Sequence, residues 1–126
     1  MNAQKIKILI AEDDKSSRNL LARILYISGF NQVEEAENGM DAWDKLQQSP
    51  FDLLITDWMM PEMDGYQLLS TIRKSALEVR NIPVIIISSL HDVEDIKKVA
   101  SLGVSGYLIK PFNTKIILQK ISAIFP

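Results

Sequence analysis

Residues 8–14 read ILIAEDD, a short aliphatic run that passes directly into three acids. An apolar run without polar alternation is typical of a strand that is buried on both faces of a parallel sheet. The acids come at the point where such a strand would end. We therefore predict a buried strand over residues 7–11, followed by a charged loop.

Strand and helix patterns alternate five times from this run to the end of the chain. The helical stretches carry apolar residues three or four positions apart. Strict alternation predicts a parallel sheet with right-handed crossovers, and so an α/β three-layer sandwich. The predicted strands are residues 7–11, 32–36, 51–56, 83–87 and 106–109, and the predicted helices are residues 14–28, 40–47, 64–74, 93–102 and 113–124. The residues expected to face the core include Leu20, Leu21, Ile24 and Leu25 in the first helix, and Ile96, Val99 and Ala100 in the fourth.

The composition indicates one globular domain over residues 1–126, because 47% of the residues are hydrophobic and 24% are charged. The chain has no cysteine, which excludes disulfides and cysteine metal sites. A net charge of −2 gives no general attraction for nucleic acid. The sequence shows neither a secretory signal nor an apolar run near the roughly 20 residues that span a bilayer. We expect a soluble cytoplasmic protein that binds neither nucleic acid nor membrane, with no effector domain in this sequence.

Polar side chains gather where the predicted strands end. Glu12 and Asp13 follow the first strand, Asp57 the third, Ser88 the fourth and Lys110 the fifth. Ligands of open parallel sheets bind beyond the carboxyl ends of the strands, so we expect these groups to lie together. Asp14 is interpreted as a helix cap. The second strand ends in further acids, Glu35 and Glu37, but nothing in the sequence places them near the others.

Clustered carboxylates repel one another unless a proton or a cation joins them. Oxygen ligands without histidine or cysteine favour a hard cation, so Mg²⁺ or Mn²⁺ is predicted, with the backbone carbonyl of Met59 as a further ligand. A carboxylate can act as a nucleophile in phosphoryl transfer, and Asp57 is the candidate. Three phosphoryl oxygens would then meet the cation, the Lys110 ammonium and the Ser88 hydroxyl.

Four blocks of sequence resemble the receiver domain of two-component response regulators, in particular the chemotaxis regulators. They are ILIAEDD at residues 8–14, DWMMPEMDG at 57–65, PVIIISS at 83–89 and GYLIKPF at 106–112. The resemblance covers about residues 7–125. It implies a flavodoxin-like fold with five helices and a five-stranded sheet of order 2-1-3-4-5. It also implies that Asp57 takes a phosphoryl group from a histidine kinase or a histidine phosphotransfer protein.

The resemblance also implies roles for single residues. Asp13, Asp57 and the Met59 carbonyl would bind the magnesium directly, and Glu12 mainly through water. Ser88 would move toward the phosphoryl group and Tyr107 would rotate inward behind it, while the Lys110–Pro111 bond would be cis. The surface of the fourth helix, fifth strand and fifth helix would then signal to a downstream protein or effector domain. Such a chain is a phosphoacceptor that catalyses its own phosphorylation and dephosphorylation, and is not otherwise an enzyme.

Further expectations concern side chains around this site. Met59 and Leu90 are apolar where this family tunes phosphoryl lifetime, which predicts a long-lived phosphoryl state. Trp58 is expected to turn away from Asp57 and to be partly exposed, and His91 to be a solvated loop residue.

Three other functions share parts of this pattern. A flavodoxin-type cofactor domain would need a hydroxyl- or glycine-rich loop after the first strand to hold a phosphate, where this chain has three acids. An aspartate-nucleophile phosphatase would carry an acid at position 59. A receiver that acts only as a binding module would not need the complete set of acid, hydroxyl and lysine.

Overall fold

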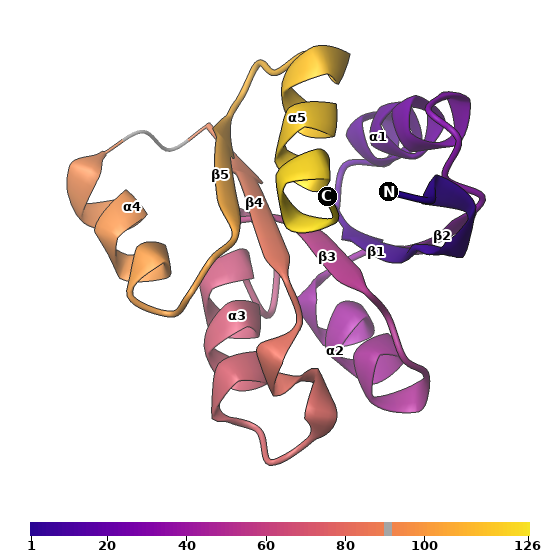
Figure 1. The fold of residues 1–126 in the computed structure, drawn as a ribbon. Coiled ribbons are helices and arrows are strands. Elements are labelled where there is room, and N and C mark those ends of the chain that lie inside the picture. Colours follow the sequence, from indigo (N-terminus) through magenta and orange to yellow (C-terminus); the bar gives the residue numbers. More distant parts are fainter. Residues whose placement is uncertain (90–91) are drawn as a thin grey trace.

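Parallel strands form the centre of the computed structural model, which describes residues 1–89 and 92–126 (Figure 1). The described strands form one sheet of order β2-β1-β3-β4-β5, as predicted, with β3 in the middle. The expectations for the lifetime role of Leu90 and the solvated His91 lie outside the described residues. The strands are β1 (Lys7–Ala11), β2 (Gln32–Ala36), β3 (Leu53–Asp57), β4 (Val84–Ser88) and β5 (Gly106–Ile109).

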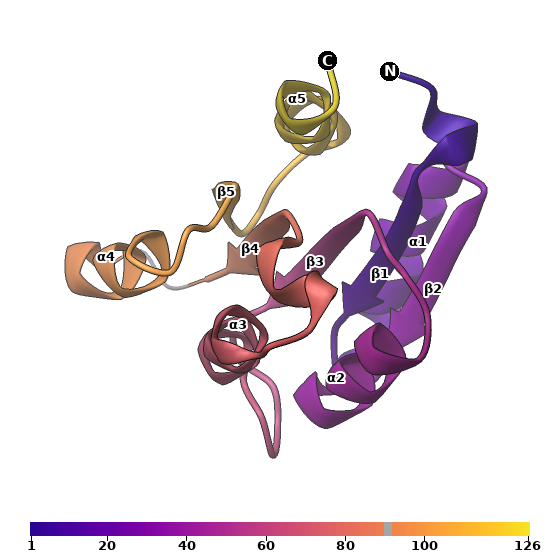
Figure 2. The ribbon, with the colours of Figure 1, turned by 60° about the horizontal axis from the view of Figure 1, so that its bottom comes forward.

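Helices cover both faces of the sheet, which gives the predicted three layers. Figure 2 shows α5 on one side of β3 and β4, with α2 and α3 on the other. The buried side chains of α1 and α5 share one core cluster, and those of α2, α3 and α4 share the second. The helices are α1 (Lys15–Ile27), α2 (Gly39–Gln48), α3 (Gly65–Lys74), α4 (Val93–Ala100) and α5 (Thr114–Ile124).

Successive residues of a strand pack into the core clusters on opposite faces of the sheet, because side chains alternate across a sheet. Ile8 and Ile10 pack with α1 and α5, whereas Leu9 between them packs with α2 and α3. All of β3 and β4 is buried, as their continuous apolar sequence predicts. β2 lies at the edge of the sheet and is mostly exposed, so its polar sequence fits its position.

The register brings the carboxyl ends of the strands to one edge. Ala11 of β1 pairs with Thr56 of β3, Asp57 pairs with Ile87 of β4, and Ser88 pairs with Ile109 of β5. The residues that follow each strand therefore emerge side by side. Acid and amide side chains then begin the next helices: Asp14, the predicted cap, accepts from the Ser17 N–H at 2.9 Å.

Several sequence predictions need correction. Leu20 is 58% exposed, because the buried face of α1 centres on Leu21 and Leu25, and Leu20 lies about 100° around the helix from Leu21. Ala100 is exposed for the same kind of reason, since Val99 is the buried residue of α4. The 3-10 helices η1 (Ala3–Lys5) and η2 (Glu78–Asn81) were not predicted. Among the described residues, no helix has the length and apolar character that crossing a membrane requires.

Candidate phosphoacceptor and cation site

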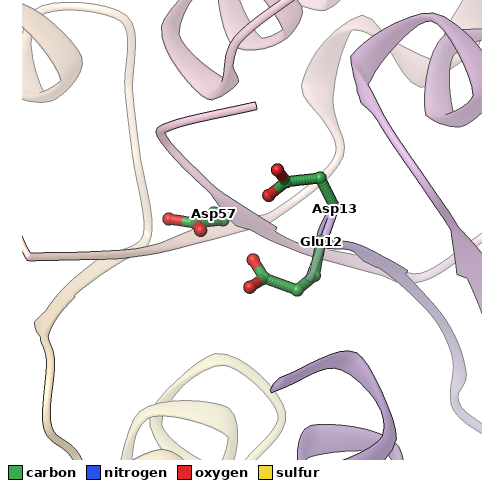
Figure 3. Close-up of side chains that lie close together, drawn as sticks. All are labelled: Glu12, Asp13 and Asp57. Carbon is green, nitrogen blue, oxygen red and sulfur yellow. The ribbon is translucent and has the colours of Figure 1, made fainter. Parts of the chain in front are cut away.

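Three carboxylates meet at the carboxyl edge of the sheet, as the sequence predicted. Glu12 and Asp13 follow β1, and Asp57 ends β3; one oxygen from each lies within 4.8 Å of the others. Figure 3 shows the side chains converging from the two neighbouring strands. Glu12 is 5% exposed and Asp57 is 9% exposed, whereas Asp13 is exposed. The cluster is therefore open to solvent on the Asp13 side and closed on the side of Glu12.

Lys110 supplies the positive charge of the cluster. Its Nζ lies 3.1 Å from Asp57 Oδ2 and 3.6 Å from Glu12 Oε1. Burial lowers the pKa of the Lys110 ammonium, but the hydrogen bond and charge of Asp57, with the charge of Glu12, outweigh burial and leave this pKa raised. Lys110 is therefore a fixed cation in direct contact with one oxygen of Asp57.

Burial favours the protonated form of the Glu12 carboxyl. Burial, and then the hydrogen bond and negative charge of Asp57, raise the pKa of Glu12 to about 8, while Lys110 acts in the other direction. A proton on Glu12 is one way to relieve the repulsion of clustered acids. A divalent cation is the other, and it would displace this proton.

Backbone contacts fix the elements that carry these groups. The Lys110 N–H donates to the Ser88 carbonyl at 2.8 Å, and the Gly65 N–H donates to the Trp58 carbonyl at 2.7 Å. A Cβ on Gly65 would lie 2.3 Å from the Asp57 carbonyl oxygen, so only glycine fits there. Ser88 is fully buried at the end of β4. The Lys110–Pro111 bond is cis, as expected from the resemblance.

The donor set fits a hard divalent cation. All three converging side chains offer carboxylate oxygens, which Mg²⁺ and Mn²⁺ prefer over softer donors. Their net charge also exceeds what Lys110 alone neutralises. The acidic cluster could therefore hold a metal ion, whose identity the geometry leaves open.

Trp58 differs from its prediction. It is only 6% exposed, and its ring stacks on Tyr66 at 6.0 Å between centroids and meets Tyr107 edge-on at 6.3 Å. Trp58 belongs to the core cluster of α2, α3 and α4, where rings from α3 and β5 cover it. Tyr107 is partly buried; burial raises the pKa of its hydroxyl, and a hydrogen bond with the Ser88 side chain acts in the opposite direction.

Arg18 is a neighbour of the site that the sequence analysis missed. Its Nη1 donates to the Glu12 carbonyl at 2.9 Å, and its Nε lies 3.3 Å from Glu35 Oε1. Glu35, which the sequence left unplaced, is thus joined to the acid loop through an arginine of α1. An arginine one turn into the helix after the acids was the available signal.

The family described as the response regulator receiver domain matches residues 8–122. The chain belongs to the response regulator receiver domain family. This receiver domain is 37% identical over 122 residues to the chemotaxis protein CheY-3 of Vibrio cholerae, covering 97% of this chain and 93% of that protein. It is 35% identical over 120 residues to the chemotaxis protein CheY of Pseudomonas aeruginosa, covering 95% and 96%.

Solved structures agree with this fold. The receiver domain superposes on the chemotaxis response regulator CheY4 of Vibrio cholerae with a TM-score of 0.85 at 28% identity, covering 94% of this chain and 98% of that one. It superposes on the signal receiver domain of a signal transduction histidine kinase from Syntrophus aciditrophicus with a TM-score of 0.84 at 32% identity, covering 94% and 88%. These likenesses favour a receiver over a flavodoxin-type cofactor domain.

The predicted site residues of this receiver domain do come together in part. Glu12, Asp13, Asp57 and Lys110 form one cluster, and Ser88 lies at the end of the neighbouring strand. The Met59 side chain is 58% exposed. The role of its backbone carbonyl as a cation ligand remains a prediction.

Proposed function

We propose that this receiver domain, as a single domain over residues 1–126, accepts a phosphoryl group on Asp57 from a phosphohistidine partner in a magnesium-dependent reaction. The observation that carries this proposal is the placing of Asp57, nine-tenths buried, between two further carboxylates and the Lys110 ammonium 3.1 Å away. Burial and positive charge around one carboxylate support a nucleophile more than a solvated surface acid.

Glu12, Asp13 and Asp57 would hold the cation, with the Met59 carbonyl as a further ligand and Glu12 acting mainly through water. When bound, Mg²⁺ (or Mn²⁺) neutralises negative charge on the transferring phosphoryl oxygens. The three converging oxygens and their excess negative charge support this choice of residues.

In the transfer, a carboxylate oxygen of Asp57 forms a bond to phosphorus as the bond from phosphorus to the histidine nitrogen of the donor breaks. The electron pair of that broken bond stays on the imidazole, which leaves neutral after taking up a proton. Lys110 already contacts Asp57 and would hold one oxygen of the transferred group, and the Ser88 hydroxyl would donate to another. The same groups would act in the hydrolysis that returns Asp57 to its free state.

Signalling would follow from the new charge on Asp57. Ser88 would move toward the phosphoryl group, and Tyr107, which shares a hydrogen bond with Ser88, would follow. The surface formed by α4, β5 and α5 would then favour a second packing that a downstream protein or effector domain binds. A histidine kinase or histidine phosphotransfer protein is the proposed donor, and the cytoplasmic location predicted from the sequence belongs to this proposal.

The test is phosphorylation by acetyl phosphate in the presence and absence of Mg²⁺, with the modified residue located by mass spectrometry. We expect one acid-stable, base-labile adduct on Asp57 that needs the cation and is absent in Asp57→Asn. Asp52→Asn is the matched control, because Asp52 is an exposed acid just before the same strand.

An adduct on another residue, or one that forms equally well without a divalent cation, would contradict the proposal. Continuous release of phosphate without an accumulating adduct would favour the aspartate-nucleophile phosphatase instead.

A further inference from the structure

Arg18 connects the acid loop to the end of β2. Its side chain is 11% exposed, although α1 is an outer helix, and it reaches one acceptor in the loop after β1 and one on β2. Nη1 donates to the Glu12 carbonyl at 2.9 Å, and Nε lies 3.3 Å from Glu35 Oε1. A nearly buried guanidinium with two partners holds a fixed position and links the two segments that it contacts. We call this link of Arg18 to Glu12 and Glu35 the strut. An exposed ion pair, in contrast, contributes little to stability.

The peptide groups of Glu12 are held from both sides. The Glu12 N–H donates to the carbonyl of Ala36 at 3.1 Å, and its carbonyl accepts from Arg18. Ala36 directly follows Glu35, the partner of Arg18 on β2. The end of β2 thus fixes the Glu12 backbone once directly and once through the arginine.

This hold matters most for Asp13. The carbonyl that Arg18 binds belongs to the peptide that joins Glu12 to Asp13, so its orientation sets where the Asp13 backbone points. Asp13 is exposed, and no side-chain hydrogen bond to its carboxylate is seen in residues 1–89 and 92–126. The direction of this carboxylate therefore depends on the backbone that precedes it.

We propose that Arg18, anchored by Glu35, is a positioning residue that aims the Glu12 and Asp13 carboxylates at a divalent cation shared with Asp57. This inference rests on the proposed function, because it assumes that the three acids bind the cation. Residues behind metal ligands commonly change metal affinity by roughly 10- to 100-fold when they are replaced.

A simple electrostatic argument predicts the opposite result, which makes the proposal easy to test. Arg18 is a positive charge near a cation site, so its removal should tighten cation binding if charge alone mattered. Positioning predicts weaker binding. Arg18→Lys keeps the charge but loses the planar fork that reaches two acceptors at once, so positioning predicts a loss there too.

The experiment is isothermal titration of Mg²⁺ into the wild-type chain, Arg18→Lys, Arg18→Met and Arg23→Met at one pH. Arg23 is an exposed arginine of the same helix, so Arg23→Met removes the same charge without touching the strut. We expect about tenfold weaker binding in both Arg18 variants and little change in Arg23→Met. Phosphorylation by acetyl phosphate should need more Mg²⁺ for half-maximal rate in the Arg18 variants, with the rate at saturating Mg²⁺ largely kept.

Binding by Arg18→Met that is equal to wild type or tighter would overturn the inference while leaving the proposed function intact. A wild-type chain that does not bind Mg²⁺ would instead remove the proposed function first. Should the Arg18 variants fail to fold, Glu35→Gln gives the same answer through a half-exposed residue. Its control is Glu34→Gln on the same strand, where Glu34 pairs with Lys7 at 3.2 Å. Glu35→Gln should bind Mg²⁺ several-fold more weakly than Glu34→Gln, and equal affinities would refute the strut.

Discussion

The carboxyl and amino edges of the sheet are formed by opposite ends of the same strands. Charged side chains are buried at the carboxyl edge and exposed to solvent at the amino edge. Among the described residues, the buried polar side chains are Glu12, Thr56, Asp57 and Ser88, and all of them lie at the carboxyl edge. At the amino edge the charged groups stay in water: Asp52 is exposed, and the pair of Lys7 and Glu34 is partly exposed. A groove of about 780 Å³ lies there, bordered largely by apolar side chains including Leu46, Phe51, Leu77 and Phe125.

This difference separates what the fold needs from what the site needs. Burying carboxylates beside one another costs free energy that a stable core would avoid. The raised pKa of Glu12 is the sign of that cost. The amino edge shows that the same strands can carry their charged groups in water, so the fold alone does not require the buried charge at the carboxyl edge.

Replacement of Lys110 should give the largest loss of phosphorylation rate. A small loss would contradict the difference drawn between the two edges of the sheet. Lys110→Met removes the cation against Asp57, and we expect phosphorylation by acetyl phosphate to slow by roughly 100-fold. Lys7→Met is the control, because Lys7 forms an ion pair and covers the Phe51 ring at the opposite edge. Its rate should stay within about twofold of wild type. An unchanged rate in Lys110→Met would mean that this partly exposed ammonium is structural.

Two glycines, one at each edge of the sheet, allow the edges to be compared through the free energy of unfolding. An added methyl at Gly65 meets the Asp57 carbonyl at 2.3 Å, so Gly65→Ala must displace backbone at the carboxyl edge and should cost about 2 kcal/mol in the free energy of unfolding. Gly106 begins β5 at the amino edge, where a Cβ would meet its nearest neighbour at an ordinary 3.5 Å. Gly106→Ala should change this free energy by less than about 0.5 kcal/mol. Urea denaturation of both variants measures the difference, and equal effects would contradict the crowding seen at Gly65.

A pH series tests the proton that Glu12 carries at the carboxyl edge. Because Glu12 carries a proton below about pH 8, a cation must displace it, and Mg²⁺ affinity should rise with pH until Glu12 is ionised. The expected slope is about tenfold per pH unit for one released proton. Titration calorimetry between pH 6.5 and 9 would measure this slope. The pH at which the slope levels off would give the pKa of Glu12 to roughly half a pH unit. Glu12→Gln, which has no proton to release, should flatten the profile; an unchanged slope in that variant would assign the proton to another group.

The same group predicts the sign of a stability change in the absence of metal. The folded-state pKa of Glu12 lies above its ordinary value of 4.5, so the folded chain binds more protons than the unfolded chain between these two values. The contribution of Glu12 to folding stability is therefore present at low pH and is lost as pH rises through about 8.

Much of this architecture could be predicted from local pattern. The apolar runs of β3 and β4 and the acids after β1 were enough to predict the sheet and its charged edge, because burial on both faces demands such runs. Strand ends were less predictable: β3 extends to Asp57 and β4 to Ser88, since ladder pairing continues into the polar residues. The exposure of Leu20 was missed because an apolar residue beside a helical stripe looks the same in sequence whether or not a neighbour covers it.

The site was predictable where it depends on strand order and unpredictable where it depends on side chains meeting across elements. The proximity of Asp57 and Lys110 could be predicted from the parallel arrangement of the strands alone. The contact of Arg18 with Glu35 depends on side chains from α1 and β2, and the covering of Trp58 depends on Tyr66 of α3 and Tyr107 of β5. Pattern along one element carries no information about such partners.

The ring contacts of Trp58 give the chain a built-in optical probe. Two of its three tyrosines lie within about 6 Å of this indole, at 6.0 and 6.3 Å, whereas Tyr26 is 71% exposed on α1. Light absorbed by the first two should pass to the indole by resonance transfer, so any tyrosine emission should come largely from Tyr26. Because this indole directly follows Asp57 in the chain, changes at that residue should alter its share of the intrinsic emission, to which Trp43 also contributes.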